Sequence, residues 1–173
     1  MKRLFALSFA LLLTLVLFGC ESLELTKNSQ IRIVASEKVW PANFDEVAFK
    51  RDESPHYSYA VRMTTNQNDF EKTWESYQLT RERPQIDFNS KAILFLGVEE
   101  SGSCPIELST EDVKLSGQKI TIKLSGPDGP CTADATPRTF VIEIPTSKEL
   151  KELTILETGT ETTIALKDQS RVN

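Results

Sequence analysis

Histidine is almost absent from this chain, which contains only His56. Any Ser-His-Asp arrangement, and any acid/base scheme that uses an imidazole, must therefore use this residue. His56 stands between Pro55 and Tyr57 and follows Asp52 and Glu53, a composition typical of a turn. We therefore predict that His56 is a solvated loop residue and not a catalytic base.

Motifs that bind metals or phosphates are also missing. The sequence contains no EF-hand loop, no glycine-rich phosphate-binding motif and no zinc-ligand spacing. Neighbouring acids occur in three places, and such pairs can serve a glycosidase or a calcium site. Neighbouring residues of a strand point to opposite faces, however, and neighbouring acids of a loop are usually solvated. We therefore predict no catalytic residue, no metal site and no cofactor. The three pairs are Asp45 with Glu46, Glu99 with Glu100, and Glu111 with Asp112.

Positive charge is in short supply. The chain has 20 lysines and arginines against 25 aspartates and glutamates, a net charge of −5. Without Lys2 and Arg3 the balance is 18 against 25, so the remainder carries about −7. A surface that binds nucleic acid needs clustered positive charge. The composition therefore argues against nucleic acid as a partner and predicts an acidic, soluble surface.

The apolar run at residues 4–18 is too short for a transmembrane helix. It spans about 15 residues after Lys2 and Arg3, whereas crossing a bilayer takes roughly 20 apolar residues. The run ends at Gly19 and Cys20, and a polar stretch follows. A basic start, a short apolar core and a small residue at the end are the layout of an export signal. We predict a signal peptide over residues 1–19, cleaved between Gly19 and Cys20.

The end of this signal, Leu17, Phe18, Gly19 and Cys20, resembles the lipobox of bacterial lipoproteins. An aliphatic residue stands three positions before the cysteine and a small residue directly before it, although small or hydroxyl residues are commoner than phenylalanine between them. The resemblance implies a diacylglyceryl thioether on Cys20, the first residue of the mature chain, and leaves open an N-acyl chain there. Two acyl chains hold a protein stably on a bilayer, whereas one binds marginally. We therefore expect a lipid anchor on the extracytoplasmic face of the cell membrane, with an ordinary secretory signal or an uncleaved anchor as alternatives.

About 150 residues follow the signal, enough for one domain that buries its own core. Residues 20–30 are polar and lack a sustained period, which predicts a lipidated tether. Residues 31–173 are then expected to form a single β-rich globular domain. Its cysteines, Cys104 and Cys131, form an even pair in an exported chain, where disulfides persist. We predict a disulfide between them. The alternatives are two buried thiols or a metal site, which the distant His56 would leave incomplete.

Strands and one helix share the first half of this domain. Alternating patterns predict strands at residues 31–35, 46–51 and 57–64, with a turn at 52–55. The period becomes helical over residues 66–79, where Phe70, Trp74 and Tyr77 recur at i, i+4 and i+7. This spacing predicts a buried helix face, with an exposed aromatic stripe as the alternative. Trp40 fits either the core or a partner surface.

The second half of the domain consists of strand patterns. Residues 92–98 are continuously apolar, which predicts a central strand buried on both faces. The apolar residues beyond it alternate, which predicts successive antiparallel strands, with a hairpin turn at Ser116 and Gly117. The whole pattern predicts an α+β fold, mainly β, with an antiparallel sheet or sandwich and one principal helix. The alternating residues are Ile106, Leu108, Val113, Leu115, Ile120, Ile122, Leu124, Phe140, Ile142, Ile144, Ile155 and Leu166.

Residues 64–145 resemble the C-terminal domain of the protease-complex-subunit family PrcB in the order of their features. The matching pieces are an aromatic-bearing helix at 69–74, Asp87 and Phe88 before an apolar strand at 92–97, and a closing TPRTFVIEIP segment at 136–145. Where the family tends to carry a Gly-Tyr pair after the first strand, this chain has Cys104, which suggests a structural disulfide instead. The resemblance implies a lipid-anchored accessory or interaction domain that stabilises an extracytoplasmic protein, such as a protease complex, and implies no catalytic residue.

Three functions fit these patterns. The first is a non-enzymatic accessory module that docks an unidentified envelope protein near the membrane, and the PrcB resemblance favours it. The second is a lipid-anchored protease inhibitor, because a disulfide-stiffened loop binds with a lower ordering cost. The third is an envelope hydrolase, which requires a concave pocket with convergent acids. A groove beside the Cys104 loop would favour ligand binding.

Overall fold

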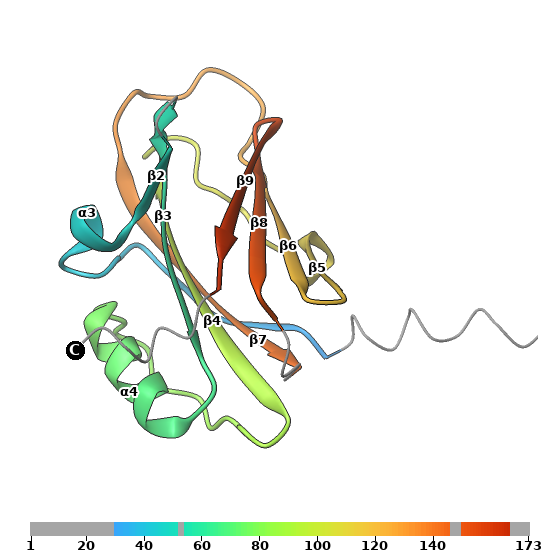
Figure 1. The fold of residues 1–173 in the computed structure, drawn as a ribbon. Coiled ribbons are helices and arrows are strands. Elements are labelled where there is room, and N and C mark those ends of the chain that lie inside the picture. The colour runs from blue at the N-terminus through green and yellow to red at the C-terminus, as the bar shows by residue number, and fades with distance from the viewer. Residues whose placement is uncertain (1–29, 52–53, 146–149, 167–173) are drawn as a thin grey trace, which may run out of the picture.

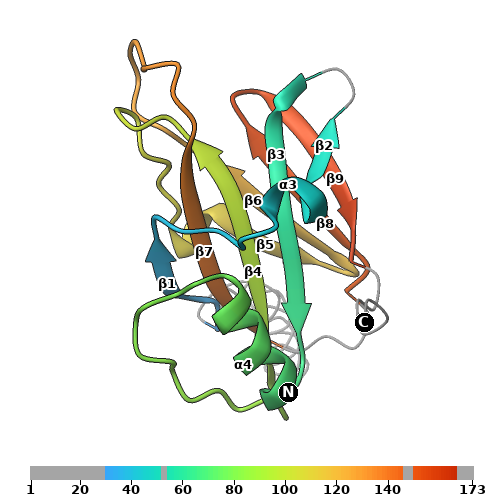
Figure 2. The same ribbon diagram turned by 90° about the vertical axis from the view of Figure 1, so that its left-hand side faces the viewer.

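The computed structural model describes residues 30–51, 54–145 and 150–166. They form two β-sheets that face each other, with helices on the outer face of one sheet (Figure 1; Figure 2). The fold is mainly β with one principal helix, as the sequence predicts. In spatial order the first sheet consists of β1 (Arg32–Glu37), β7 (Thr136–Pro145), β4 (Lys91–Glu100), β3 (Ser54–Thr64) and β2 (Phe49–Arg51).

The second sheet contains the one parallel pair between named strands of the described chain. Its strands, in spatial order, are β5 (Val113–Ser116), β6 (Lys119–Leu124), β8 (Glu152–Glu157) and β9 (Thr160–Ala165). β6 and β8 are parallel, whereas their other neighbours are antiparallel. The prediction of successive antiparallel strands is wrong here, because β7 crosses to the first sheet and pairs with β1 and β4 before the chain returns.

A loop replaces the strand expected around Ile106 and Leu108. The segment contains only an isolated bridge between Glu107 and Ser125, with a 2.8 Å hydrogen bond from the Glu107 amide to the Ser125 carbonyl oxygen. Both apolar side chains nevertheless contact the core between the sheets. The alternation of Ile106 and Leu108 therefore reflects the burial of both side chains against the core, and these residues do not form a β-strand.

Apolar side chains from both sheets fill the space between them, drawn mainly from β4, β6, β7 and β8. β3 contributes Tyr59, Val61 and Met63 to this core from one face, as its alternation predicts. The side chain of Tyr57, expected on the same face, lies outside the described residues. Because one core joins the two sheets, the ends of their strands are held in fixed relative positions.

The helix α4 (Gln67–Ser76) covers the outer face of the first sheet. Its aromatic residues Phe70 and Trp74, and Tyr77 directly after it, are buried, which confirms the predicted core face. Their ring centroids lie 6.0, 6.4 and 5.2 Å, respectively, from that of Phe95 in β4. Asn66 caps the helix by accepting a 2.9 Å hydrogen bond from the amide of residue 69.

The central strand β4 is buried on both faces, as its continuous apolar run predicts. Ile93 and Phe95 pack on the helical side, whereas Leu94 and Leu96 pack against the second sheet. β3 and β7 flank it, and ten residue pairs join it to β7. β4 therefore contributes to both cores from the middle of the first sheet.

A short helix, α3 (Phe44–Val47), occupies part of the strand expected at residues 46–51, and only β2 remains of that strand. Phe44 is buried and stacks on Trp40, with ring centroids 4.2 Å apart. A 2.8 Å hydrogen bond from the Ala48 amide to the Phe44 carbonyl oxygen closes the turn. Burial of Phe44 outweighs the local alternation, and it also places half-buried Trp40 against the helical side of the core.

Replacing Phe95 by alanine tests the importance of β4. The ring is fully buried among three aromatic neighbours, so Phe95→Ala should lower the free energy of unfolding by about 3–5 kcal/mol. Phe49→Ala is the matched control, because Phe49 is 41% exposed, and it should cost about 1 kcal/mol or less. Urea unfolding followed by tryptophan fluorescence measures both. Equal losses in the two variants would contradict the assigned role of β4.

Candidate functional site

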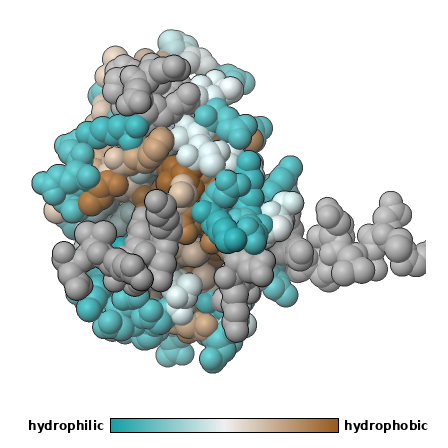
Figure 3. All heavy atoms as spheres, in the orientation of Figure 1, coloured by the Kyte–Doolittle hydropathy of each residue, from teal (hydrophilic) through white to brown (hydrophobic). Residues whose placement is uncertain are grey.

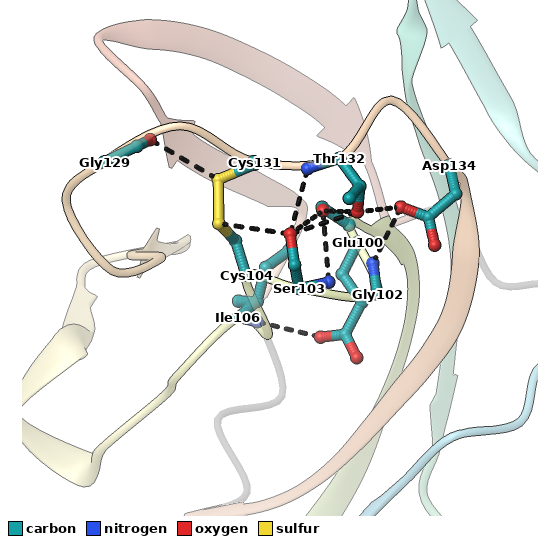
Figure 4. Close-up of a disulfide and its surroundings, with 10 residues drawn as sticks. Glu100, Gly102, Ser103, Cys104, Ile106, Gly129, Cys131, Thr132 and Asp134 are labelled. Atoms are coloured by element: carbon teal, nitrogen blue, oxygen red, sulfur yellow. Dashed lines mark hydrogen bonds between the residues drawn. A yellow bond between two sulfur atoms is a disulfide. The ribbon is translucent and has the colours of Figure 1, made fainter.

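Two loops leave the same end of the sandwich, one after β4 and one between β6 and β7 (Figure 1). Cys104 lies in the first loop and Cys131 in the second. The structure brings their Sγ atoms to disulfide-bonding distance, with the two Cα atoms 5.6 Å apart (Figure 4). This is the pairing that the sequence analysis predicts. The disulfide fixes the two loops against each other and encloses the β5–β6 hairpin.

Polar side chains join the same loops beside the disulfide (Figure 4). The hydroxyl oxygens of Ser103 and Thr132 lie 3.0 Å apart, and the Thr132 amide donates to Ser103 Oγ at 2.9 Å. Asp134 accepts hydrogen bonds from the Thr132 hydroxyl and from the Gly102 amide. These two bonds, the Thr132 bond foremost, hold the pKa of the Asp134 carboxyl below its usual range. The loops are therefore held together by polar contacts as well as by the covalent bond.

A buried carboxylate anchors the first loop to the sheet. Glu100, the last residue of β4, accepts hydrogen bonds from Arg138 Nε at 3.0 Å and Nη2 at 2.8 Å. It also accepts a 2.8 Å bond from the Ile106 amide (Figure 4). A bidentate arginine compensates the buried charge. The sequence does not predict this role: an acid at the end of an apolar strand is visible in it, but the pairing of β4 with β7, which brings Arg138 to Glu100, depends on the tertiary arrangement.

An open cleft of about 610 Å³ lies beside the disulfide. Its walls come from both disulfide loops, from the end of β6 and from the turn between β8 and β9. Cys104, Cys131, Leu124, Glu157 and Thr158 represent these elements among the lining residues. The volume falls within the range of about 300–1,000 Å³ that is usual for ligand sites. The cleft is thus a concave site on two loops that a disulfide and hydrogen bonds join.

The cleft has an acidic lining. Of the described residues around it, five are aspartate or glutamate and none is lysine or arginine. Arg138 forms an ion pair with Glu100, whereas no ion pair among the described residues includes Asp128, Asp134 or Glu157. Low-dielectric walls strengthen the field of such charges inside a concavity. The geometry therefore favours a positively charged ligand.

Glu157 is a half-buried acid of the cleft. Its Oε2 atom accepts a 2.6 Å hydrogen bond from the hydroxyl of Tyr59, which is buried in β3 of the opposite sheet. Burial raises the pKa of Glu157 above its ordinary value of 4.5, and the Tyr59 hydrogen bond partly opposes the shift. No ion pair in the described part of the chain includes Glu157. Among the described residues, the Glu157 carboxylate therefore has no counter-ion.

A second cleft, of about 590 Å³, lies between α3, β3 and α4. It is lined by Arg62, Lys72 and Glu46 together with polar and apolar residues, and the disulfide does not border it. Val47, which lines it, and nearby Phe49 are exposed by 52% and 41%. Figure 3 shows a largely hydrophilic face with apolar residues visible near its middle. This cleft differs from the first in charge, and its walls have no covalent brace.

The predicted cleavage and lipidation residues, Gly19 and Cys20, lie outside the described residues. The side chain of His56 does so as well, but its backbone lies in β3. The expectation of a loop at this position is therefore wrong for the backbone, because β3 begins at Ser54, where that residue pairs with Arg51. In residues 30–51, 54–145 and 150–166, no helix is both long and apolar enough to cross a bilayer.

One acid of each neighbouring pair in the sequence serves local structure. Asp112 accepts hydrogen bonds from the Ser109 amide and hydroxyl at 2.9 and 2.7 Å, which lower the pKa of its carboxyl. Asp45 lies 3.3 Å from Lys50 Nζ, and Glu100 pairs with Arg138. Across the described chain, no group of three or more histidine, cysteine, aspartate or glutamate side chains could hold a metal ion.

Removing the disulfide should destabilise the fold. The 27-residue separation of Cys104 and Cys131 corresponds to about 3–4 kcal/mol of lost loop entropy in the unfolded chain. The free energy of unfolding of the double variant Cys104→Ala/Cys131→Ala should therefore be lower by this amount, and its urea midpoint should fall accordingly. Wild-type protein reduced with dithiothreitol is the control and should approach the same midpoint. An unchanged midpoint in both samples would contradict the bracing role of the bond.

Glu157 should make stability depend on pH with a defined sign. Because its pKa is raised in the folded state, the folded protein binds the proton more tightly than the unfolded chain. Stability from this group is therefore present below pH 4.5 and is lost as pH rises towards the raised pKa. The unfolding free energy of wild type relative to Glu157→Gln should fall over this window. Parallel urea titrations between pH 4 and 7 measure it, with Glu71→Gln on α4 giving the background, and a rise would contradict the assignment.

Comparisons with protein families, with curated proteins and with solved structures found no match for this chain. The site is consequently defined by its own geometry. It is an acidic cleft whose two main loops are held together by a disulfide and a polar network, and whose half-buried carboxylate faces a tyrosine of the opposite sheet.

Proposed function

We propose that this chain is a lipid-anchored extracytoplasmic lipoprotein, and that it acts as a non-enzymatic protein-interaction module, docking an envelope protein through the disulfide-braced cleft. The observation that carries the proposal is the cleft itself, whose loops are cross-linked by Cys104 and Cys131. Loops that are already ordered bind a partner with a smaller loss of conformational entropy. A braced concave end is therefore a suitable docking surface.

The anchor is supported by the sequence. Leu17, Gly19 and Cys20 stand at the positions of a lipobox after a short apolar segment. A disulfide fits the same destination, because such bonds persist outside the reducing cytoplasm. Residues 20–30 would then serve as the tether. Lipidation confines the module to the membrane surface, which raises its effective concentration towards other envelope proteins.

The resemblance of residues 64–145 to the PrcB family supports an accessory role. It covers α4, the central strand β4 and the closing strand β7, and the disulfide loops lie between these elements. Stabilising a protease complex is the function that this resemblance implies. In such a role the module contributes binding energy to its partner and performs no chemistry of its own.

An envelope hydrolase is the second candidate, because the cleft is concave and acidic. Burial raises the pKa of Glu157 and hydrogen bonds lower the pKa of Asp134, and acids with opposite shifts can act as an acid/base pair. Asp134, however, accepts its hydrogen bonds from the two loops that it joins. Its carboxylate therefore holds the loops together and is not free to act as a base. For this reason we favour binding over hydrolysis.

Site-specific photo-crosslinking in intact cells tests the docking proposal. A photo-reactive residue replaces Asp128 at the rim of the cleft in the full chain, and the same residue replaces Glu71 on α4, at the opposite end of the molecule, as control (Figure 1). A discrete protein adduct is expected from position 128 and not from position 71. Placing Cys20→Ala in the position-128 chain should move it out of the membrane fraction and remove the adduct. No adduct at position 128, or equal adducts at both positions, would refute docking through the cleft.

A further inference from the structure

We infer that the acidic cleft receives a lysine or arginine side chain of the partner protein, and that Glu157 is the carboxylate that binds its positive end. This inference rests on the proposed docking function and goes beyond it by naming the chemistry that the cleft recognises. It stands on three observations: the position of Glu157, the apolar residues beside it and the charge of the surrounding lining.

Glu157 is held in place before any ligand arrives. It is the last residue of β8, and its Oε2 atom accepts a hydrogen bond from Tyr59 at 2.6 Å. Tyr59 is only 1% exposed and belongs to the core between the sheets, so this contact fixes the carboxylate on a rigid element. A charged group that is preoriented in this way loses little conformational entropy when it binds an oppositely charged group.

The position of Glu157 is unfavourable for a lone charge. Removing a carboxylate from water costs free energy unless a counter-ion compensates it. Glu100, a buried acid at this end, has Arg138 as its compensating cation. Glu157 has a neutral phenol as its hydrogen-bond partner instead. The contrast between the two carboxylates indicates that the second charge is matched by an incoming cation.

The rest of the lining fits a long side chain better than a bare ion. Ile106 and Leu124 line the same cleft and are nearly buried, and they can pack against the methylene stem of lysine or arginine. Asp128 adds negative charge around it. A metal ion is disfavoured, because among the described residues no group of three or more potential ligands is assembled. A volume of about 610 Å³ also exceeds the space that one ion fills.

Fluorescence polarisation with the full chain in detergent tests the inference. The probe is a fluorescein-labelled peptide of four arginines in 0.15 M salt, and the matched probe carries four citrullines, which keep the shape of arginine without its charge. The arginine peptide should bind at least tenfold more tightly than the citrulline peptide. Glu157→Gln keeps an oxygen for Tyr59 but removes the charge, and it should weaken binding of the arginine peptide about tenfold. Glu71→Gln removes one charge from α4 and should change the affinity less than twofold.

Each other outcome has a defined meaning. Equal weakening by Glu157→Gln and Glu71→Gln would show non-specific attraction to an acidic protein and would overturn the inference. So would equal binding of the two peptides to the wild-type chain, a result that needs no variant to fold. Displacement of the arginine peptide by millimolar calcium, with loss of calcium binding in Glu157→Gln, would assign the cleft to a metal and likewise overturn it.

The crosslinking assay separates failure of this inference from failure of the docking proposal. With the photo-reactive residue at position 128, introducing Glu157→Gln should remove most of the adduct. An adduct that persists in this variant would overturn the role of Glu157 and leave docking through the cleft intact. Absence of the adduct from the chain with unaltered Glu157 would refute docking itself.

Discussion

Burial of β4 on both faces is the constraint from which the rest of the structure follows. Its odd-numbered apolar residues Ile93 and Phe95 bind the helical layer, and Leu94 and Leu96 bind the second sheet. β4 thereby contributes to both hydrophobic cores, and its neighbours β3 and β7 do so as well. The same strand ends at Glu100, where the loop that contains Cys104 begins. Glu100 accepts hydrogen bonds from Arg138 and from the Ile106 amide, which hold the start of this loop against the sheet. The rigidity of the core is in this way transmitted to the rim of the cleft.

The site combines two kinds of rigidity that act on different elements. The disulfide and the hydroxyl network join the loop after β4 to the loop before β7. The Tyr59 bond joins the first sheet to Glu157 at the end of β8. The cleft lies between these two connections. The elements that line it are therefore held to strands that pack on the core between the sheets. Such an arrangement suits recognition, in which affinity depends on groups that are already in place.

Local patterns predicted the elements that have strong periodic or compositional signals. The aromatic spacing of Phe70, Trp74 and Tyr77 identified α4, the unbroken apolar run identified β4, and two cysteines left over from the signal identified the bridge. α3 was missed because its four residues are held by burial of Phe44, which no short-range pattern reports. The parallel pairing of β6 with β8, and the contact of Tyr59 with Glu157 across 98 positions, depend on the tertiary arrangement. A single sequence does not encode strand partners in its periodicity.

Between β6 and β8 of the second sheet, the chain crosses to the first sheet and forms β7. This crossing affects the order in which the strands can pair during folding. β1, near the start of the described chain, completes its ladder with residues 136–145, and these also form one border of β4. Neither the amino-terminal strand nor the middle of the first sheet can therefore close while that distant segment is still missing. In a polypeptide that emerges amino terminus first, these strands keep unpaired edges and exposed apolar surface until most of the chain has emerged. This topology is therefore expected to fold slowly and to depend on chaperones that bind the unpaired strands.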